Sequence, residues 1–446
     1  MAISAVEQYL LELINRARLD PLAEAERYNL ALNDDLPDGT ISADAKMVLA
    51  HNTLLEDAAW DHSDWMLDND VFSHTGAGGS DPGQRMDDAG YNFAGYWAWR
   101  ENLAWSGTTG ILSLANAAEI HHEGLYRSEG HRENTFGENV REIGIAQVEG
   151  HFTSNGTTYN ASMLTLNYAS TGSDNFVTGV SYVDYNGNEF YDIGEADASL
   201  WVSADGTSVN VATAGGYGIS VTPDAQTLVR IGDSGGEIAR LEVDTRYGNG
   251  KLDVVTDAGG DKTLFLSATA TLVSGVSDAM LLGVADLDLS GTSGANRLTG
   301  NAGDNTIQGE GGDDIIAGGD GMDALFGGDG DDLIYGGGGR AIDWGDIIES
   351  SAQDTTADLL FGGAGNDVMH GYSGADTLDG GAGDDTMTGG SGRDTFVFRE
   401  GRDTITDYSC FADTLQLDAA LLGLVGLSDA AILAMGSVVE GDTIFD

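Results

Sequence analysis

The sequence has a single cysteine, Cys410, among 446 residues. No intrachain disulfide can form, so packing or bound metal must stabilise the fold. Basic residues are also scarce: 19 Lys and Arg stand against 73 Asp and Glu, which gives a formal net charge of −54. This excludes nucleic acid as a partner, because clustered Lys and Arg supply the attraction to phosphates. Self-repulsion among the acids opposes compaction unless cations bind, and hard cations such as Ca2+ are the natural partners.

Two kinds of apolar segment are missing as well. The first residues lack the basic head and unbroken apolar run of a signal peptide, because Glu7 and Glu12 interrupt them, so we expect export by another route. The most apolar long stretch, which starts at Leu264, is broken by Gly275 and Asp278 and is too polar to span a bilayer. We therefore expect no transmembrane segment.

Composition divides the chain into four parts, and we expect a multidomain protein. Residues 1–170 contain helix-period patterns and most of the tryptophan and histidine, which indicates a mixed α/β domain. Residues 175–288 alternate β-branched runs with Gly, Asn and Asp, which favours a small β-sandwich. Residues 291–398 repeat with a period of nine, and residues 399–446 form an acidic, Leu- and Ala-rich tail.

The nonapeptide repeats are the strongest signal in the sequence. Each unit combines a Gly-rich turn, an acidic or amide residue at its fifth place and an aliphatic residue two places later, as in GDGDDLIYG. Glycine permits positive φ, so turn carbonyls can point inward and join the side-chain oxygens around Ca2+. We expect the ligands to be Asn305, Asp314, Asp323, Asp332, Asp358, Asp367, Asp376, Asp385 and Asp394. So thin an apolar core predicts disorder without Ca2+, and the alternative is an acidic Gly-rich linker.

An insertion from Gly337 to about residue 362 interrupts the period before Asp358 and Leu360 restart it, so the calcium sites beside it are less defined. The repeats and the tail DTITDYSCFADTLQLDAA resemble the C-terminal module of the RTX family. The resemblance implies a parallel β-roll, a secreted protein of a Gram-negative bacterium and export by the type I secretion machinery through an uncleaved C-terminal signal. Family tails commonly run beyond a stretch like VVEGDTIFD, which implies a truncated signal region at residues 399–446.

A separate twelve-residue loop, DYNGNEFYDIGE, has the ligand spacing of an EF-hand. Its side-chain oxygens at positions 1, 3, 5, 9 and 12, and the backbone carbonyl at position 7, belong to Asp184, Asn186, Asn188, Asp192, Glu195 and Phe190. Glu189 replaces the turn glycine at position 6, and no flanking helices are evident. The loop resembles those of SdrD-type B repeats, which are immunoglobulin-like β-modules, so we expect a calcium site here rather than a plain polar hairpin.

The N-terminal domain carries the segments FSHTGAGGSDPGQRMDDAGY, RENLAWSG and HHEGLYRSEGHRENTFGENVREIGIA. Together they resemble the bacterial CAP/SCP family over about residues 5–168. The resemblance implies an α/β/α sandwich whose cleft gathers two His and two Glu, which fall on His74, Glu101, His131 and Glu123. His122 competes for the place of Glu123, and adjacent helical residues point about 100° apart, so we expect only one of His122 and Glu123 to face the cleft.

Two imidazoles and two carboxylates in one cleft could hold Zn2+ in an open site or act as a general acid and base. A hydrogen-bonded cluster that fixes loops is the third interpretation. His51 and His62 are given no role. We expect a protein that binds an unidentified lipid, protein or other ligand at or near cell surfaces, with Ca2+ driving the folding of its roll. The alternatives are a metal-dependent or acid/base hydrolase that uses the cleft, and an adhesive or surface-layer component.

Overall fold

The computed structural model describes residues 3–337, apart from residues 173 and 224, and residues 355–417, apart from residue 400. Two further strand pairs are described by their backbone: β21 (Ile342–Asp343) with β22 (Asp346–Ile347), and β32 (Gly436–Val439) with β33 (Asp442–Phe445). The chain divides into two compact units: Met1–Ile238 with Val243–Lys262, and Ala239–Glu242 with Thr263–Asp446. No helix among the described residues is long and apolar enough to cross a membrane.

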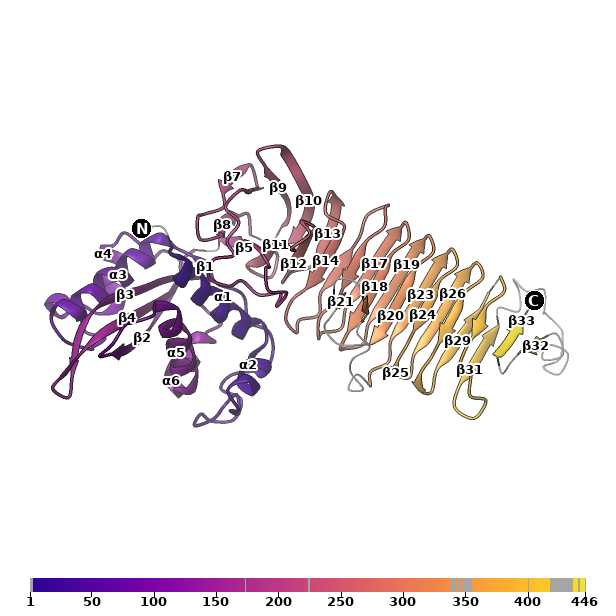
Figure 1. Ribbon diagram of the computed structural model, residues 1–446, viewed down its shortest axis with the longest axis horizontal. Helices are drawn as coiled ribbons and strands as arrows, with labels where there is room; N and C mark the ends of the chain where they lie inside the picture. Colours follow the sequence, from indigo (N-terminus) through magenta and orange to yellow (C-terminus); the bar gives the residue numbers. More distant parts are fainter. Residues whose placement is uncertain are drawn as a thin grey trace. The chain divides into compact units, whose positions relative to one another are not determined.

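A four-stranded sheet between two layers of helices forms the first part of unit 1 (Figure 1). The strands are β1 (Ala50–His51), β2 (Ala98–Thr108), β3 (Glu142–Ser154) and β4 (Thr157–Ser170). The helices are α1 (Ala5–Leu19), α2 (Pro21–Arg27), α3 (Thr53–Asp68), α4 (Pro82–Asp88), α5 (Leu114–Arg127) and α6 (Glu129–Thr135), with a 3-10 turn at Ala77–Gly79. The sheet order is β1-β3-β4-β2, with β1 parallel to β3 and the other neighbours antiparallel. Helices α3 and α5 cover opposite faces, which confirms the predicted α/β/α sandwich.

Local sequence explains how two of these helices are placed. Ser4 and Glu7 form a capping box at the start of α1: the Ser4 hydroxyl accepts from the Glu7 N–H, and the Glu7 carboxylate accepts from the Ser4 N–H. Helix α3 lies very close to β3, because residue 144 is glycine. A Cβ atom on Gly144 would lie 2.0 Å from the carbonyl carbon of Leu55 in α3.

The second part of unit 1 is built from strands that begin at Asn175. They are β5 (Asn175–Val183), β6 (Trp201–Ala204), β7 (Thr207–Asn210), β8 (Gly216–Val221), β9 (Gln226–Asp233), β10 (Gly236–Asp244) and β11 (Gly250–Thr256). The middle of β10, Ala239–Glu242, is assigned to unit 2. Strand β5 pairs antiparallel with β8 and parallel with β11, and β6 pairs antiparallel with β7 and β9. The buried Lys251 Nζ lies 2.8 Å from Glu12 Oε2 in α1. The boundary expected near residue 170 is therefore a change of architecture inside one compact unit.

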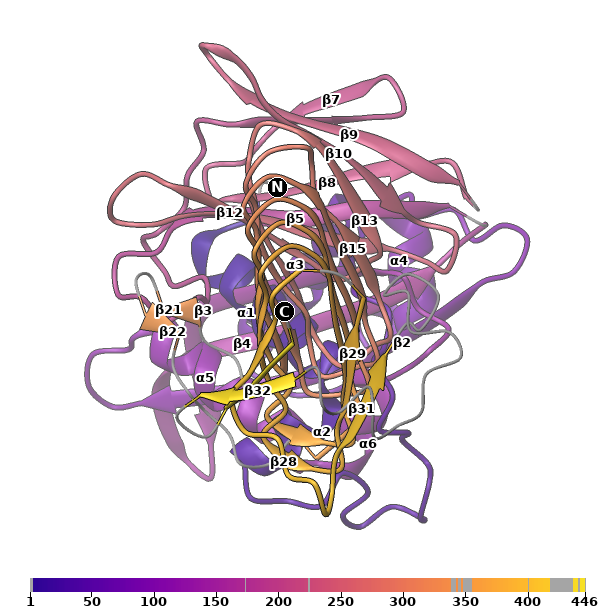
Figure 2. The same cartoon turned by 90° about the vertical axis from the view of Figure 1, so that its right-hand side faces the viewer.

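Unit 2 is a coil of short parallel strands (Figure 2). They are β12 (Lys262–Leu266), β13 (Ala270–Ser274), β14 (Asp278–Leu281), β15 (Asp288–Ser290), β16 (Arg297–Thr299), β17 (Thr306–Gly311), β18 (Ile315–Gly319), β19 (Ala324–Asp329), β20 (Leu333–Gly337), β23 (Leu359–Ala364), β24 (Val368–His370), β25 (Ser373–Gly374), β26 (Thr377–Ala382), β27 (Thr386–Thr388), β28 (Ser391–Gly392), β29 (Thr395–Phe398), β30 (Thr404–Ile405) and β31 (Thr414–Leu417).

Strand pairing confirms the predicted β-roll. Thr306 pairs with Ala324 and Ile315 with Leu333, so one coil spans two nonapeptides and neighbouring strands belong to successive coils. Each nonapeptide contributes one apolar side chain to the interior, as its spacing predicts. These side chains are fully buried: Ile307, Ile316, Leu325, Ile334, Leu360, Met369, Leu378, Met387 and Phe396.

The insertion does not break the stack of coils. Strand β19 pairs directly with β23, with Leu325 opposite Leu360, and β20 pairs with β24. Asp358 and Leu360 therefore restart the coil as predicted. Residues 338–354 lie outside the described residues, apart from the backbone of β21 and β22.

The parallel coil begins earlier than the repeats. Strand β12 pairs in parallel with β14, with Thr263 opposite Asp278, although we expected the roll to start at residue 291. The alternating pattern of residues 263–290 fits antiparallel and parallel strands equally well, and only the Gly-rich repeats reveal the coil in the sequence. At the other end, β31 extends the stack to Leu417, and most of the expected secretion-signal region lies outside the described residues.

Candidate functional site

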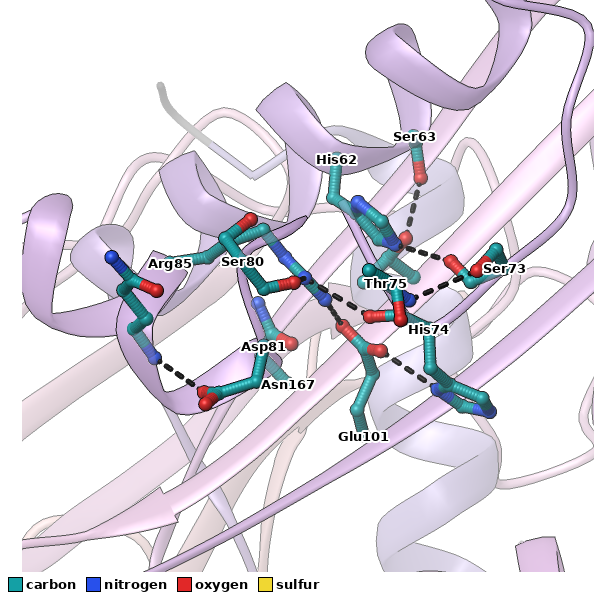
Figure 3. Close-up of polar contacts among 12 residues, drawn as sticks. His62, Ser63, Ser73, His74, Thr75, Ser80, Asp81, Arg85, Glu101 and Asn167 are labelled. Atoms are coloured by element: carbon teal, nitrogen blue, oxygen red, sulfur yellow. Dashed lines mark hydrogen bonds and ion pairs between the residues drawn. The ribbon is translucent and has the colours of Figure 1, made fainter. Parts of the chain in front are cut away.

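Glu101 is the centre of a polar cluster in the N-terminal domain (Figure 3). It lies in β2 with its carboxylate almost fully buried. His74 Nδ1 donates to Glu101 Oε1 at 2.8 Å, and Arg85 Nη2 of α4 donates to Glu101 Oε2. Arg85 also donates to the backbone carbonyls of Ser80 and His74, at 3.0 and 3.1 Å. Both oxygens of the buried carboxylate therefore already have a donor, one of which carries a permanent positive charge.

A pocket of about 460 Å³ opens beside this cluster. Its walls are formed by His74, Pro82, Trp99, Arg100, Glu101, Asn134 and Asn139. The His74 side chain is 56% exposed, so its ring can meet a ligand, whereas the Glu101 side chain is 1% exposed. Trp99 lies against residue 83, where only glycine fits, because a Cβ atom on Gly83 would be 2.5 Å from the indole nitrogen.

His131 lies near His74 but not in the wall of the pocket. Burial lowers the pKa of His131 and the proximity of His74 lowers it further, so the neutral imidazole is favoured. The His131 backbone carbonyl accepts from Asn102 Nδ2 at 3.0 Å. The structure thus brings His74 and Glu101 into direct contact and places His131 next to them.

The cleft residue expected on α5 is not in the pocket. Glu123 is half exposed and pairs with Arg127 at 2.7 Å on the outer side of the helix. His122 is buried and donates to Glu24 Oε1 at 2.9 Å. His121 is buried as well, and its Nε2 lies 3.0 Å from Ser162 Oγ. We expected either His122 or Glu123 to face the cleft; instead neither lines the pocket, because His122 is buried against Glu24 and Glu123 pairs with Arg127.

Sequence reasoning missed Arg85, Arg100, Asn134 and Asn139. Arg100 directly precedes Glu101 and Asn134 follows His131 closely, so the quoted segments contained them, but nothing in those segments marked them as ligand-contacting groups. His62, which was given no role, is buried, and its Nε2 lies 2.9 Å from the Ser73 carbonyl beside His74. His62 therefore helps to fix the loop that carries His74.

In the roll, each buried Asp carboxylate accepts a hydrogen bond from the backbone of the neighbouring coil. The backbone N–H of Asp314 donates to Asp332 Oδ1 at 2.8 Å, and that of Asp367 donates to Asp385 Oδ1 at 2.9 Å. The same bond recurs along the roll for the other predicted Asp residues, namely Asp323, Asp358, Asp376 and Asp394. Asn305 takes part as a donor through its backbone N–H to Asp323. Asp403 and Asp413, which were not predicted, extend the pattern into the tail.

The second oxygen of these carboxylates, Oδ2, shows whether the residues of the roll fit a bound cation. Among the described residues, five buried Oδ2 atoms have no hydrogen-bond partner, those of Asp314, Asp332, Asp367, Asp385 and Asp403. A Cβ atom on Gly309 would lie 2.2 Å from Asp314 Oδ2 and 2.5 Å from the Gly327 carbonyl oxygen, so two acceptors crowd one point. Buried acceptors that face each other without a donor fit an oxygen-binding cation such as Ca2+.

The loop of residues 184–195 adopts a compact turn around Asp184. The Asp184 carboxylate accepts from the backbone N–H groups of Gly187, Asn188 and Glu189. Glu195 accepts from Tyr185 and Asp192 N–H groups at 3.1 and 3.0 Å. Asn186 and Asn188 both donate through their amides to Asp192 Oδ2, at 2.7 and 2.9 Å, and the Phe190 ring packs 6.0 Å from that of Tyr9. The side chains at positions 1, 3, 5, 9 and 12 are thus gathered in one loop.

No group of three or more His, Cys, Asp or Glu side chains in the described part of the chain is close enough to hold a metal. Zn2+ in the cleft, which we weighed from the sequence, is therefore not supported. Calcium sites in the roll and the loop would need backbone carbonyl and amide oxygens to complete them.

Comparison with protein families supports both resemblances. A model described as the RTX calcium-binding nonapeptide repeat matches four times, at residues 290–323, 317–340, 354–387 and 370–405. A model described as the cysteine-rich secretory protein family matches residues 11–168. The N-terminal sandwich is thus a CAP domain, and the coil contains calcium-binding RTX repeats.

Two solved structures are similar to parts of the chain. An outer surface protein from Borrelia burgdorferi has 16% identity and a TM-score of 0.24, over 39% of this chain and 97% of that one. An extracellular protein containing an SCP domain from Bacillus anthracis has 23% identity and a TM-score of 0.21, over 36% of this chain and 39% of that one. Comparison with curated proteins gave no match.

Proposed function

We propose that this protein, which joins a cysteine-rich secretory protein domain to calcium-binding nonapeptide repeats, is secreted and binds a ligand at or near a cell surface. The CAP domain would bind the ligand, and Ca2+ would drive folding of the roll that carries it. The observation that carries the calcium part is the set of five buried Asp Oδ2 atoms without a hydrogen-bond partner among the described residues.

Asp side chains and turn carbonyl groups of the roll would both contribute oxygen ligands to Ca2+. Each Asp fixes the register of two coils through Oδ1 and offers Oδ2, while turn glycines bring carbonyl oxygens close. Bound Ca2+ supplies the positive charge that these oxygens lack and takes six to eight oxygen ligands. We propose these ligands: Asp314, Asp323, Asp332, Asp358, Asp367, Asp376, Asp385 and Asp394, with Asn305 in the first repeat.

A further calcium site is proposed in the loop of residues 184–195. Its support is the EF-hand spacing of the oxygens together with the left-handed backbone at Glu189, with φ of 57°, at the position where that spacing calls for glycine. The loop turns as an EF-hand loop does although the residue there has a side chain.

Export by type I secretion machinery of a Gram-negative bacterium is the proposed route. Extracellular calcium modules bind with dissociation constants on the order of 10⁻⁴ to 10⁻³ M. Such weak sites would stay empty in the cytosol and fill outside, so the roll would remain unfolded until it has left the cell.

The cleft geometry disfavours Glu101 as the base of a hydrolase. A hydrolase that used Glu101 as a base would need a free carboxylate, and in the structure both of its oxygens accept bonds, from His74 and Arg85. The adhesive alternative differs from our proposal only in whether the CAP domain has a specific ligand.

A Ca2+ titration followed by circular dichroism tests the calcium proposal. The full chain should gain β-structure with Ca2+, and the double variant Asp332→Asn with Asp367→Asn should need more Ca2+ to do so. The matched control is Asp320→Asn, since Asp320 is exposed in the same roll. An unchanged spectrum of the wild-type chain with Ca2+ would contradict the proposal, and equal midpoints for the double variant and the control would remove these two carboxylates from the sites.

A further inference from the structure

The pocket of the CAP domain differs in charge from the rest of the chain. The whole protein has a net charge of −54, with only 19 Lys and Arg residues. The pocket wall nevertheless holds Arg100 and the exposed His74, and its only carboxylate is that of Glu101. That carboxylate is already paired with Arg85, so the cluster and the wall together have more positive than negative groups.

Arg100 is the cation that lacks an acidic partner. Its guanidinium donates to neutral amide oxygens, Asn134 Oδ1 at 3.2 Å and Asn139 Oδ1 at 3.4 Å. No carboxylate pairs with it in the described part of the chain. The neighbouring acid in sequence, Glu138, pairs instead with Lys46 at 3.4 Å. In a protein this acidic, a wall cation without a carboxylate partner indicates that the missing negative charge belongs to a ligand.

The position of Arg100 is also fixed. A Cβ atom on Gly137 would lie 2.6 Å from Arg100 Nε, so the glycine makes room for the guanidinium. Asn134 is held in turn, since its amide donates to the Glu101 carbonyl at 3.2 Å and to Asn102 Oδ1 at 2.9 Å. A preorganised guanidinium of this kind suits a carboxylate, which it can meet with two parallel N–H donors.

One aromatic ring lines the pocket, and two exposed aromatic residues directly precede it in the sequence. Trp99 forms part of the pocket wall and is 36% exposed. Trp97, two residues earlier, is 51% exposed, and Tyr96 is 74% exposed. A flat ring beside amides and a guanidinium suits a sugar, whose C–H groups pack on an aromatic ring while its hydroxyl and carboxylate groups take hydrogen bonds.

We infer that the pocket binds an acidic saccharide, with the sugar carboxylate on Arg100 and its ring against Trp99. The inference rests on the proposed function, because it names the ligand class of the same cleft. The pocket volume of about 460 Å³ suits a short saccharide, and the negative charge of the whole chain disfavours long polyanions. A phosphate or a lipid headgroup would satisfy Arg100 equally but would leave the position of Trp99 in the wall unexplained.

The test uses the full chain in saturating Ca2+ and isothermal titration calorimetry with a galacturonic acid trisaccharide. The methyl-esterified trisaccharide removes the charge and keeps the rings. We expect the acid to bind at least tenfold more tightly than the ester, Arg100→Gln to remove that preference, and Trp99→Ala to weaken both ligands. Arg230→Gln is the control, since Arg230 is a half-exposed arginine in the same unit, and Arg100→Lys should keep part of the preference.

Equal affinity for acid and ester, or no measurable binding of either, would overturn the inference even if the variants fold. Competition by inorganic phosphate as strong as that by the trisaccharide would overturn the saccharide part. In parallel, this protein is labelled with a fluorescent dye, and its adsorption to bacterial cells is measured with and without Ca2+. Calcium-dependent adsorption that Arg100→Gln leaves unchanged would overturn the inference alone, whereas absence of adsorption together with absence of any calcium response would count against the proposed function.

Discussion

Asp332 and Asp367 lie in adjacent coils of the roll, and the backbone N–H of Asp332 donates to Asp367 Oδ1 at 2.8 Å. The other oxygen of each carboxylate, Oδ2, has no hydrogen-bond partner among the described residues. Each side chain therefore fixes the stacking of coils with one oxygen and keeps the other for a cation. Because the register and the cation share one carboxylate, we expect coil stacking and Ca2+ binding to be lost together.

Low pH should partly replace Ca2+ in stabilising the stacked coils, because protonation also removes the negative charge of the buried Asp carboxylates. Burial, together with neighbouring Asp carboxylates, raises the pKa of Asp314, Asp367 and Asp403 from an ordinary value of 3.8 to about 7. A raised folded-state pKa means stability that is full below 3.8 and is lost as the pH rises through about 7. In EDTA, the β-sheet signal in circular dichroism should therefore grow as the pH falls from about 8 to about 5, while in Ca2+ it should stay constant.

General relief of charge repulsion at low pH would mimic this effect, so the control compares two triple variants. Asp→Asn at the buried residues Asp314, Asp367 and Asp403 should flatten the pH profile in EDTA. Asp→Asn at the exposed residues Asp304, Asp320 and Asp384 should leave it in place. Equal profiles for the two triples would assign the pH effect to net charge alone.

A single methyl group near a carboxylate should also disrupt a coil. A Cβ atom on Gly327 would lie 2.2 Å from Asp332 Oδ2 and 2.5 Å from the Gly362 carbonyl oxygen. We expect Gly327→Ala to lower the free energy of unfolding in Ca2+ by about 1–3 kcal/mol and to raise the Ca2+ concentration at half-folding. Gly294→Ala is the control, since its nearest neighbour would be 3.9 Å away, and an equal loss in both variants would contradict the prediction.

The roll was predictable from sequence because each nonapeptide repeats the same pattern of a Gly-rich turn, a buried Asp and a buried aliphatic residue. The fifth-place Asp and the aliphatic two residues later, such as Asp332 and Ile334, are both buried in the structure. The coils from Thr263 to residue 290 were not predicted, since they have no glycine period. In the cleft, the family resemblance implied that His74 and Glu101 lie in one place, but it did not indicate Arg85, because nothing in the sequence tells which carboxylate a flexible arginine will reach.

Glu189 should be replaceable by glycine with a gain in stability. Its φ of 57° is a left-handed conformation that costs a residue with a side chain about 1–2 kcal/mol. Glu189→Gly should therefore raise the free energy of unfolding of unit 1, followed by tryptophan fluorescence, by about 1 kcal/mol, and should lower the Ca2+ concentration that the loop needs. Gly187→Ala, at φ of 72° in the same loop, should have the opposite effect. A loss of stability in Glu189→Gly would show that the Glu189 side chain stabilises the loop more than its backbone conformation costs.

The buried pair of Arg85 and Glu101 should respond to mutation as a unit. The Arg85 and Glu101 side chains are 10% and 1% exposed, so removing the guanidinium leaves a carboxylate with little water to solvate it. We expect Arg85→Gln to cost about 3 kcal/mol in the free energy of unfolding, and the double variant with Glu101→Gln to cost clearly less than the sum of the two single changes. The matched control is Arg127→Gln, which breaks the half-exposed pair with Glu123 and should cost less than about 1 kcal/mol. Additive costs for Arg85 and Glu101 would show that the carboxylate is stabilised mainly by other donors, such as His74.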